Sequence, residues 1–156
     1  MKNKKFSLLK ITTFALLATI VLFVALYCIF AQQIVDMNQV PDDSGQNIAQ
    51  GLGFVVVLVL MIYACGYGAI VQLVFGILFA TVKKHKGQKI SMIVYLVLHA
   101  IFVPALLYVV VLLLATFKLP WLMVVATVAV VGLTLFNLVL TCLALASHKK
   151  AMHALD

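Results

Sequence analysis

Each long apolar stretch of the sequence has an uncharged polar residue close to its middle, and these residues are Thr19, Gln72, His99 and Asn137. Hydroxyl, carboxamide and imidazole groups both donate and accept hydrogen bonds, and an imidazole also binds a proton. A single imidazole among apolar residues is expected to stay uncharged, because the loss of water disfavours its protonated form. The chemistry predicted for these residues is therefore hydrogen bonding with one another.

The sequence offers no other reactive arrangement. Its serines lie outside the deep parts of the apolar stretches, and one His lies inside them, so neither a Ser–His nucleophile nor a metal site is expected. HExxH motifs and glycine-rich phosphate loops are absent. All 11 basic residues are Lys, and without the bidentate fork of Arg no nucleic-acid partner is expected. We predict no catalytic residue, no metal and no cofactor, and hence no enzyme.

The elements that carry the polar residues are expected to cross a membrane. Of the 156 residues, 66% are hydrophobic and 10% are charged, whereas a soluble domain is about 45–50% apolar and about 25% charged. Apolar stretches of membrane-spanning length cover residues 11–34, 52–82, 90–117 and 121–146. The sequence therefore predicts an all-α polytopic membrane protein, in which residues 1–156 form a single membrane domain, an antiparallel bundle of four transmembrane helices.

The charged residues predict the orientation of this bundle. Ten of the 11 Lys residues lie at the amino end, in the middle connector or in the tail. The middle connector carries Lys83, Lys84, Lys86 and Lys89, and the first connector carries Asp36, Asp42 and Asp43. Because Lys-rich segments remain cytoplasmic, both termini are predicted to face the cytoplasm, with the protein in the plasma (inner) membrane. Lys in place of Arg, together with the absence of Glu, favours a bacterial source.

Two of these segments have a second interpretation. The first apolar stretch follows several Lys residues, and Ala31 could precede the cleavage site of a secretory signal peptide. Against cleavage, the apolar region of about 20 residues is longer than the usual ~7–15. The acidic connector has the composition of a solvated turn, and contact with a cationic peptide or another outer-face partner is the alternative.

The position of each polar residue along its span predicts a polar layer. At about 1.5 Å per residue, the four polar residues lie at nearly one depth, on the cytoplasmic side of the middle of each span. Small residues flank Gln72 at four-residue intervals and Thr residues flank Asn137 at intervals related to the heptad, which marks faces that pack inside the bundle. The small-residue stripe consists of Ala64, Gly68, Gly76 and Ala80, and the polar seam consists of Thr127, Thr134 and Thr141.

Three further features bear on the bundle. Pro104 is expected to kink the third helix and to free a carbonyl close to the polar layer. Cys28 and Cys65 fall at similar depths, where apolar packing is expected and a redox pair is the alternative. An aromatic belt at the outer leaflet is expected from Tyr27, Tyr63, Tyr108 and Trp121.

The polar layer leads to two hypotheses for function. As a structural layer, its hydrogen bonds contribute about 0.6 kcal/mol each and set helix register. The protein is then a non-catalytic interaction protein: an accessory subunit, assembly factor or immunity-type protector. Its partners are the lipid bilayer and another membrane protein or peptide, or a second copy. As a pathway, the layer makes the protein a small oligomeric channel or transporter for a neutral or weakly charged solute. The lack of charged residues within the spans argues against ion-coupled transport.

Overall fold

The computed structural model describes residues 4–37, 45–116 and 121–153. These residues form four α-helices: α1 Lys4–Met37, α2 Gly45–Thr81, α3 His85–Thr116 and α4 Trp121–His153. Each helix contains a segment long and apolar enough to cross a membrane: Lys4–Gln32, Gly53–Thr81, His85–Ala115 and Trp121–Ser147. The predicted all-α fold with four membrane-length helices is confirmed, and the chain is a multi-pass membrane protein.

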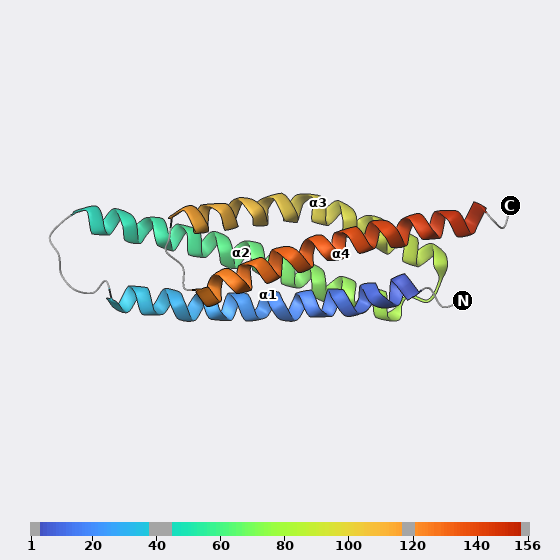
Figure 1. The fold of residues 1–156 in the computed structure, drawn as a ribbon, viewed down its shortest axis with the longest axis horizontal. Helices are drawn as coiled ribbons and strands as arrows, with labels where there is room; N and C mark the ends of the chain where they lie inside the picture. The colour runs from blue at the N-terminus through green and yellow to red at the C-terminus, as the bar shows by residue number, and fades with distance from the viewer. Residues whose placement is uncertain (1–3, 38–44, 117–120, 154–156) are drawn as a thin grey trace.

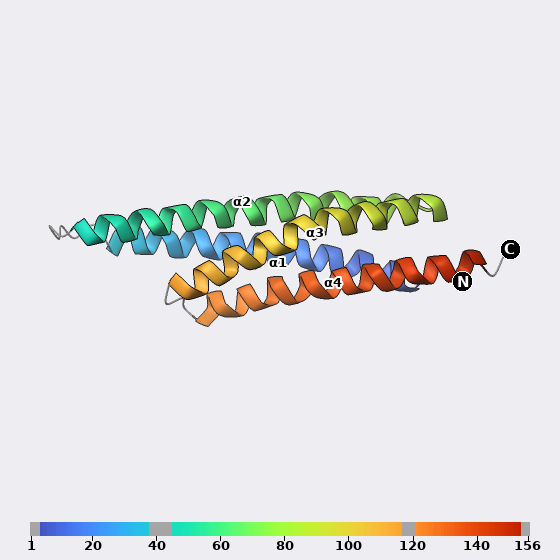
Figure 2. The same ribbon diagram turned by 90° about the horizontal axis from the view of Figure 1, so that it is seen from above.

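The four helices run up and down as an antiparallel bundle (Figure 1). α1 packs against α2 and α4, and α3 packs against the same two helices, so the order around the bundle is α1, α2, α3, α4. The start of α1, the end of α4 and the connection between α2 and α3 lie at one end (Figures 1 and 2). We call this the terminal end of the bundle and the opposite one the far end.

The helices extend beyond the apolar stretches that predicted them. α1 begins at Lys4 instead of residue 11, α2 at Gly45 instead of 52, and α3 at His85 instead of 90, and α4 continues to His153 instead of 146. A helix satisfies its own backbone hydrogen bonds whatever its side chains, so it continues into polar flanks until a breaker or a turn stops it.

The connection between α2 and α3 is short and hydrogen-bonded. The backbone N–H of Val82 donates to the carbonyl of Leu78 at 2.9 Å, and the side-chain amide of Gln88 donates to the carbonyl of Val82 at 3.3 Å. Exposed Lys83 and Lys84 lie in this connection. The other two lysines assigned to the connector, Lys86 and Lys89, instead lie in the first turns of α3.

The outer surface of the bundle is apolar, unlike that of a water-soluble bundle. Large aliphatic side chains point outward from every helix, among them Ile11, Ile70, Ile101 and Val128, each at least 64% exposed. The carboxamides of Gln72 and Asn137 and the imidazole of His99 are instead fully buried. In a lipid environment this arrangement is favourable, because acyl chains cannot satisfy polar groups.

Two apolar clusters fill the interior of the bundle. The far cluster includes Phe23 and Tyr27 of α1, Met61 of α2 and Phe102 of α3. The terminal cluster includes Phe6, Leu9, Phe75, Phe79, Tyr95 and Ala144. Within the terminal cluster, the rings of Phe6 and Phe79 meet edge to face with centroids 5.5 Å apart. Along α3 and α4, the buried His99 and Asn137 lie between residues of the two clusters.

α3 lies beside α2 near their connection and diverges from it toward the far end (Figure 2). Pro104 stands within α3 and has no N–H to donate to the carbonyl of Ala100. Both Pro104 and Ala100 are exposed. The expectation of a freed carbonyl beside the polar layer is therefore corrected: this part of α3 faces outward, because the buried face of the helix carries His99 and Phe102 instead.

Candidate functional site

Six buried side chains from all four helices meet in the middle of the bundle. We call this group the polar centre; it consists of Thr12 and Thr13 of α1, Gln72 of α2, Tyr95 and His99 of α3 and Asn137 of α4. Hydrogen bonds join them into one connected group. The network therefore ties together helices that are neighbours around the bundle, and it includes every helix.

Asn137 links α4 to both α1 and α3. Its side-chain N–H2 donates to the hydroxyl of Tyr95 at 2.7 Å and to the hydroxyl of Thr13 at 3.0 Å. Its carbonyl oxygen accepts a hydrogen bond from the hydroxyl of Thr12 at 2.7 Å. The side chain of Asn137 thus uses both of its amide protons and its oxygen inside the bundle.

Gln72 links α2 to α3 in a similar manner. Its carbonyl oxygen accepts from the hydroxyl of Tyr95 at 3.1 Å, and its amide nitrogen lies 2.7 Å from Nε2 of His99. An amide nitrogen only donates, so Nε2 of His99 is the acceptor. The proton of the neutral imidazole is then on Nδ1, which donates to the main-chain carbonyl of Tyr95 at 3.0 Å.

Aromatic rings enclose the imidazole. The ring of Tyr95 stacks on His99 with centroids 3.9 Å apart, and the edge of Phe102 approaches at 5.7 Å. On its other side Tyr95 meets Phe75 edge to face at 5.1 Å. This packing holds the imidazole plane in a single orientation, so the direction of its hydrogen bonds is set by the surrounding rings as well as by Gln72.

The polar centre contains three of the four predicted layer residues, namely Gln72, His99 and Asn137. Thr19 is a correction. It is only partly buried, and its hydroxyl donates to the carbonyl of Ala15 in its own helix at 2.8 Å. Because α1 begins at Lys4, the middle of its apolar segment lies nearer the amino end than residues 11–34 implied. The level of the polar centre consequently falls one to two turns earlier in α1.

Thr12, Thr13 and Tyr95 were not predicted to belong to the site. One signal was present for Tyr95, which precedes His99 by four residues and so shares its helix face. Another was the Thr12–Thr13 pair, which stands one helical turn from the buried Leu9 and Leu16. Neither signal defines a hydrogen-bond partner, because partners depend on how neighbouring helices are rotated.

The small-residue stripe of α2 is only partly internal. Gly68 and Gly76 are buried, Ala64 is half-buried and Ala80 is exposed. Aromatic rings, and not the backbone of a neighbouring helix, pack against these two glycines. A Cβ atom at Gly68 would overlap the ring of Phe102, and one at Gly76 would lie 3.1 Å from the ring of Phe14. The expectation of close backbone approach along this stripe is thus corrected, because its two glycines make room for aromatic side chains.

The Thr seam of α4 faces the interior, and its hydroxyls bond within α4. Each of the three donates to the carbonyl four residues earlier, at 2.6–2.7 Å, and the residues concerned are Thr127, Thr134 and Thr141. The seam is therefore buried without joining the polar centre through its side chains.

The aromatic residues expected at the outer leaflet separate into two groups. Tyr63, Tyr108 and Trp121 are exposed, as a lipid-facing belt requires, whereas Tyr27 is buried in the far cluster. Its hydroxyl has no hydrogen-bond partner in the described part of the chain. The two cysteines considered as a pair also differ, since Cys28 is exposed and Cys65 is buried.

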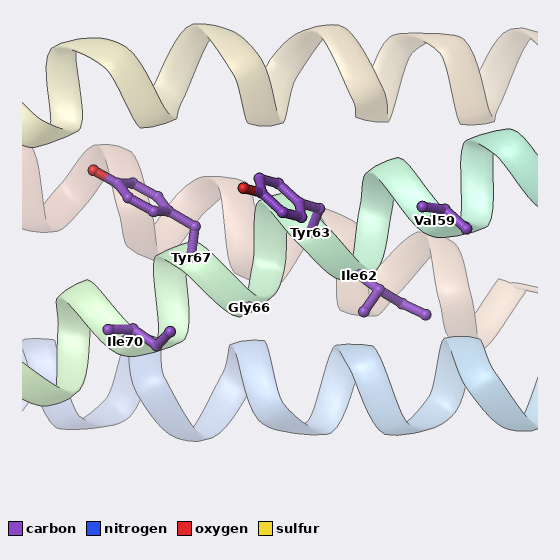
Figure 3. A pocket seen from close by; sticks show the side chains of 6 residues that line it. All are labelled: Val59, Ile62, Tyr63, Gly66, Tyr67 and Ile70. Atoms are coloured by element: carbon purple, nitrogen blue, oxygen red, sulfur yellow. The ribbon is translucent and has the colours of Figure 1, made fainter.

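An outward-facing groove lies on α2 (Figure 3). The six residues that line it are Val59, Ile62, Tyr63, Gly66, Tyr67 and Ile70. We call it the α2 groove. Tyr63 is 79% exposed, Tyr67 is 38% exposed, and nothing lies within 4 Å of a Cβ atom built on Gly66. The groove is therefore open to contact from outside the bundle.

The tyrosine hydroxyls of the α2 groove differ from that of Tyr95. No hydrogen bond joins Tyr63 or Tyr67 to another residue in the described ranges. Tyr67 occupies the middle of the apolar segment Gly53–Thr81, a depth at which lipid offers no hydrogen-bond partner. The groove thus combines an apolar floor with two hydroxyls that have bonding capacity left.

The acidic side chains of the first connector are not covered by the described part of the structure. Asp42 and Asp43 lie outside the described residues, and the side chain of Asp36 is likewise outside them. Comparisons of this chain with protein-family models, with curated proteins and with solved structures find no match.

Proposed function

We propose that this chain is a non-catalytic membrane protein that binds another membrane protein or a membrane-inserted peptide. It acts as an accessory subunit, an assembly factor or an immunity-type protector. The observation that carries the proposal is the contrast between its two polar sites. The polar centre uses its hydrogen-bonding groups within the bundle, whereas the α2 groove presents two hydroxyls outward at membrane depth.

The partner proposed for the α2 groove is a transmembrane helix that carries a polar side chain near the middle of the membrane. Gly66 allows the backbone of such a helix to approach closely, as small residues do in membrane helix pairs. Tyr63 and Tyr67 would then bond its polar group, which lipid alone cannot do. The aliphatic residues Val59, Ile62 and Ile70 provide the packing surface.

The second hypothesis, transport of a neutral solute through the polar centre, has less support. A solute would have to break hydrogen bonds of 2.7–3.1 Å that already pair Gln72, Tyr95, His99 and Asn137. The rings packed against the imidazole also occupy the space beside it. A structural role for the polar centre requires no such rearrangement.

The orientation of the protein belongs to the same proposal. The excess of Lys at the terminal end supports a cytoplasmic location for both termini. The composition supports the plasma membrane of a bacterium. In this orientation the α2 groove lies between the middle of the membrane and its outer face, where it meets spans of other proteins.

Photo-crosslinking in native membranes tests the proposal. A photoreactive residue at Ile70, in the groove, is compared with one at Val128, which is equally exposed on α4. We expect a discrete crosslinked protein from position 70 that is absent from position 128. Gly66→Phe should abolish it by filling the groove, whereas Gly132→Phe should preserve it, since both glycines have open space around a Cβ.

Two results would contradict this proposal. Equal crosslinking from positions 70 and 128 would show that contact with the α2 groove is unselective. Solute flux through liposomes that contain only this protein, abolished by Asn137→Leu in a folded bundle, would favour the transporter instead.

A further inference from the structure

Four hydrogen bonds of the polar centre follow one another with their donors pointing the same way. The Thr12 hydroxyl donates to Asn137, Asn137 donates to Tyr95, Tyr95 donates to Gln72, and Gln72 donates to His99. The chain of donors therefore runs from α1 through α4, α3 and α2 and ends on the lone pair of His99 Nε2. The series ends at that nitrogen, because the proton of the neutral imidazole is on Nδ1 and donates to the main-chain carbonyl of Tyr95.

We propose that His99 Nε2 is a proton-binding site, and that proton binding there reverses the direction of every hydrogen bond in this chain. The step is simple: a proton from the aqueous phase forms an N–H bond with the Nε2 lone pair, and the imidazole gains one positive charge. No oxidation or group transfer is involved. The proposal goes beyond the proposed function and does not depend on it.

The reversal follows from the chemistry of the paired groups. A protonated Nε2 would oppose the amide N–H2 of Gln72 across 2.7 Å, with two donors facing each other. Rotation of the Gln72 carboxamide by half a turn places its oxygen against Nε2 and its nitrogen against the Tyr95 hydroxyl. That hydroxyl then accepts from Gln72 and directs its own proton to Asn137.

The reversal can continue through Asn137 to Thr12, at the other end of this series of hydrogen bonds. When the Asn137 carboxamide rotates in turn, its oxygen accepts from Tyr95 and its nitrogen donates to Thr12. The Thr12 hydroxyl has main-chain acceptors within reach, the carbonyls of Leu8 and Leu9, both at 3.1 Å. Each group along this series of hydrogen bonds therefore has a partner in both directions. The Thr13 hydroxyl, which accepts from Asn137 and donates to the Leu9 carbonyl, would then donate to the Asn137 oxygen.

The reversed hydrogen bonds require a positively charged imidazole, and the other neutral tautomer of His99 does not produce them. In a neutral imidazole with its proton on Nε2, the Nδ1 lone pair would face the Tyr95 carbonyl oxygen at 3.0 Å, which is repulsive. The reversed chain therefore fits an imidazole protonated at both nitrogens. The stacked ring of Tyr95 favours that cation through the π electrons of its face.

The side chains around the imidazole of His99 are uncharged, so a proton bound at Nε2 would be the charge that sets the direction of the hydrogen bonds. α2 presents the uncharged Gln72, α3 presents Tyr95 and Phe102, and α1 and α4 reach the imidazole through Tyr95. Among the described residues, Tyr95 is the other titratable group in contact with it. Since all four helices share the chain, a proton bound at one nitrogen changes the bonding between every neighbouring pair except α1 and α2.

Nitrogen-15 NMR of the full chain in lipid bicelles tests this proposal. His99 is identified by its loss in His99→Gln, and the sample is acidified from about pH 7 to about pH 4, a range that spans the titration of imidazole. We expect an unprotonated Nε2 at the start. Its conversion to N–H should occur at the same midpoint as changes in the carboxamide signals of Gln72 and Asn137.

Tyr95→Phe is the matched control, because it retains the stacked ring and removes the hydroxyl link. In this variant Gln72 should still follow His99, whereas Asn137 should no longer respond. The proposal is overturned if Nε2 of the wild type stays unprotonated throughout the range in the folded protein. It is equally overturned if His99 titrates while Asn137 remains unchanged.

Discussion

Tyr95 and Tyr27 are both buried in the bundle, with 0% and 1% of their surfaces exposed, and yet their hydroxyls differ. The hydroxyl of Tyr95 donates to Gln72 and accepts from Asn137, whereas that of Tyr27 has no partner among the described residues. Tyr95 lies where three other helices present polar side chains at the same level. Tyr27 lies in the far cluster, among aliphatic, aromatic and sulfur-containing residues.

The difference shows that burial of a phenol does not by itself build a polar site. Apolar packing in the far cluster depends mainly on the shape of the side chains. The Tyr27 hydroxyl therefore loses its hydrogen bonds to water there without gaining a partner. The polar centre instead requires particular groups in particular rotations, so it specifies how the helices are aligned. Substitutions at the two regions should therefore have effects of different size and sign.

The largest effect is expected at the boundary between the two regions. Gly68→Val should lower the free energy of unfolding by about 3 kcal/mol, because inserted methyl groups overpack a filled interior. A Cβ atom at this position would overlap the ring of Phe102, and Phe102 itself contacts His99. Reversible unfolding in mixed micelles measures the change. Gly132→Val, on the open face of α4, is the control and should cost much less.

The second-largest loss of stability is expected when the residue with the most hydrogen bonds in the polar centre, Asn137, is replaced. Asn137→Leu deletes three hydrogen bonds, to Thr12, Thr13 and Tyr95, and at about 0.6 kcal/mol each the expected loss of stability is about 2 kcal/mol. Thr19→Val removes a hydroxyl that bonds only its own helix and should change stability by less than about 0.5 kcal/mol. Equal losses for the two variants in the micelle assay would contradict the assignment of the polar centre.

Tyr95→Phe should have a smaller effect of the same sign. It removes the hydroxyl that joins Gln72 to Asn137 and keeps the ring that stacks on His99. Two hydrogen bonds at about 0.6 kcal/mol each give a loss of about 1 kcal/mol. Thermal denaturation in detergent, monitored by circular dichroism, should show a lowered midpoint, and an unchanged midpoint would be evidence that the network adds nothing to stability.

Tyr27→Phe is expected to leave stability unchanged or to raise it by up to about 1 kcal/mol, because it removes a buried hydroxyl that lacks a partner. The same denaturation assay compares it directly with Tyr95→Phe. Opposite signs for these two otherwise identical substitutions would establish the contrast between the regions. A loss at Tyr27 as large as that at Tyr95 would reveal a partner for its hydroxyl.

Much of the fold could be predicted from the sequence, because the length of an apolar stretch and the bilayer thickness together define a spanning helix. The ends of the helices were harder, since a helix such as α2 continues through polar residues from Gly45 without an apolar signal. The shared depth of Gln72, His99 and Asn137 could be predicted by counting residues from the middle of each apolar stretch. The error at Thr19 arose from the uncertain start of α1, which displaced the estimated middle of that helix.

The α2 groove was beyond the reach of sequence reasoning. Tyr63 was predicted to face lipid, and it is exposed. The open space beside Gly66, however, is a property of the folded bundle. It is not encoded in the composition of one helix, because it depends on which side chains of the bundle lie nearby.

The sequence by itself determined that this protein crosses a membrane four times and that a few polar groups must be hidden from lipid, since both follow from transfer free energies of single residues. The tertiary structure decided which of those groups meet. Hydrogen bonds are directional and short, so the rotation and register of four packed helices brought Thr12, Thr13 and Tyr95 into the polar centre. The same packing left Thr19 at its edge and Tyr27 without a partner.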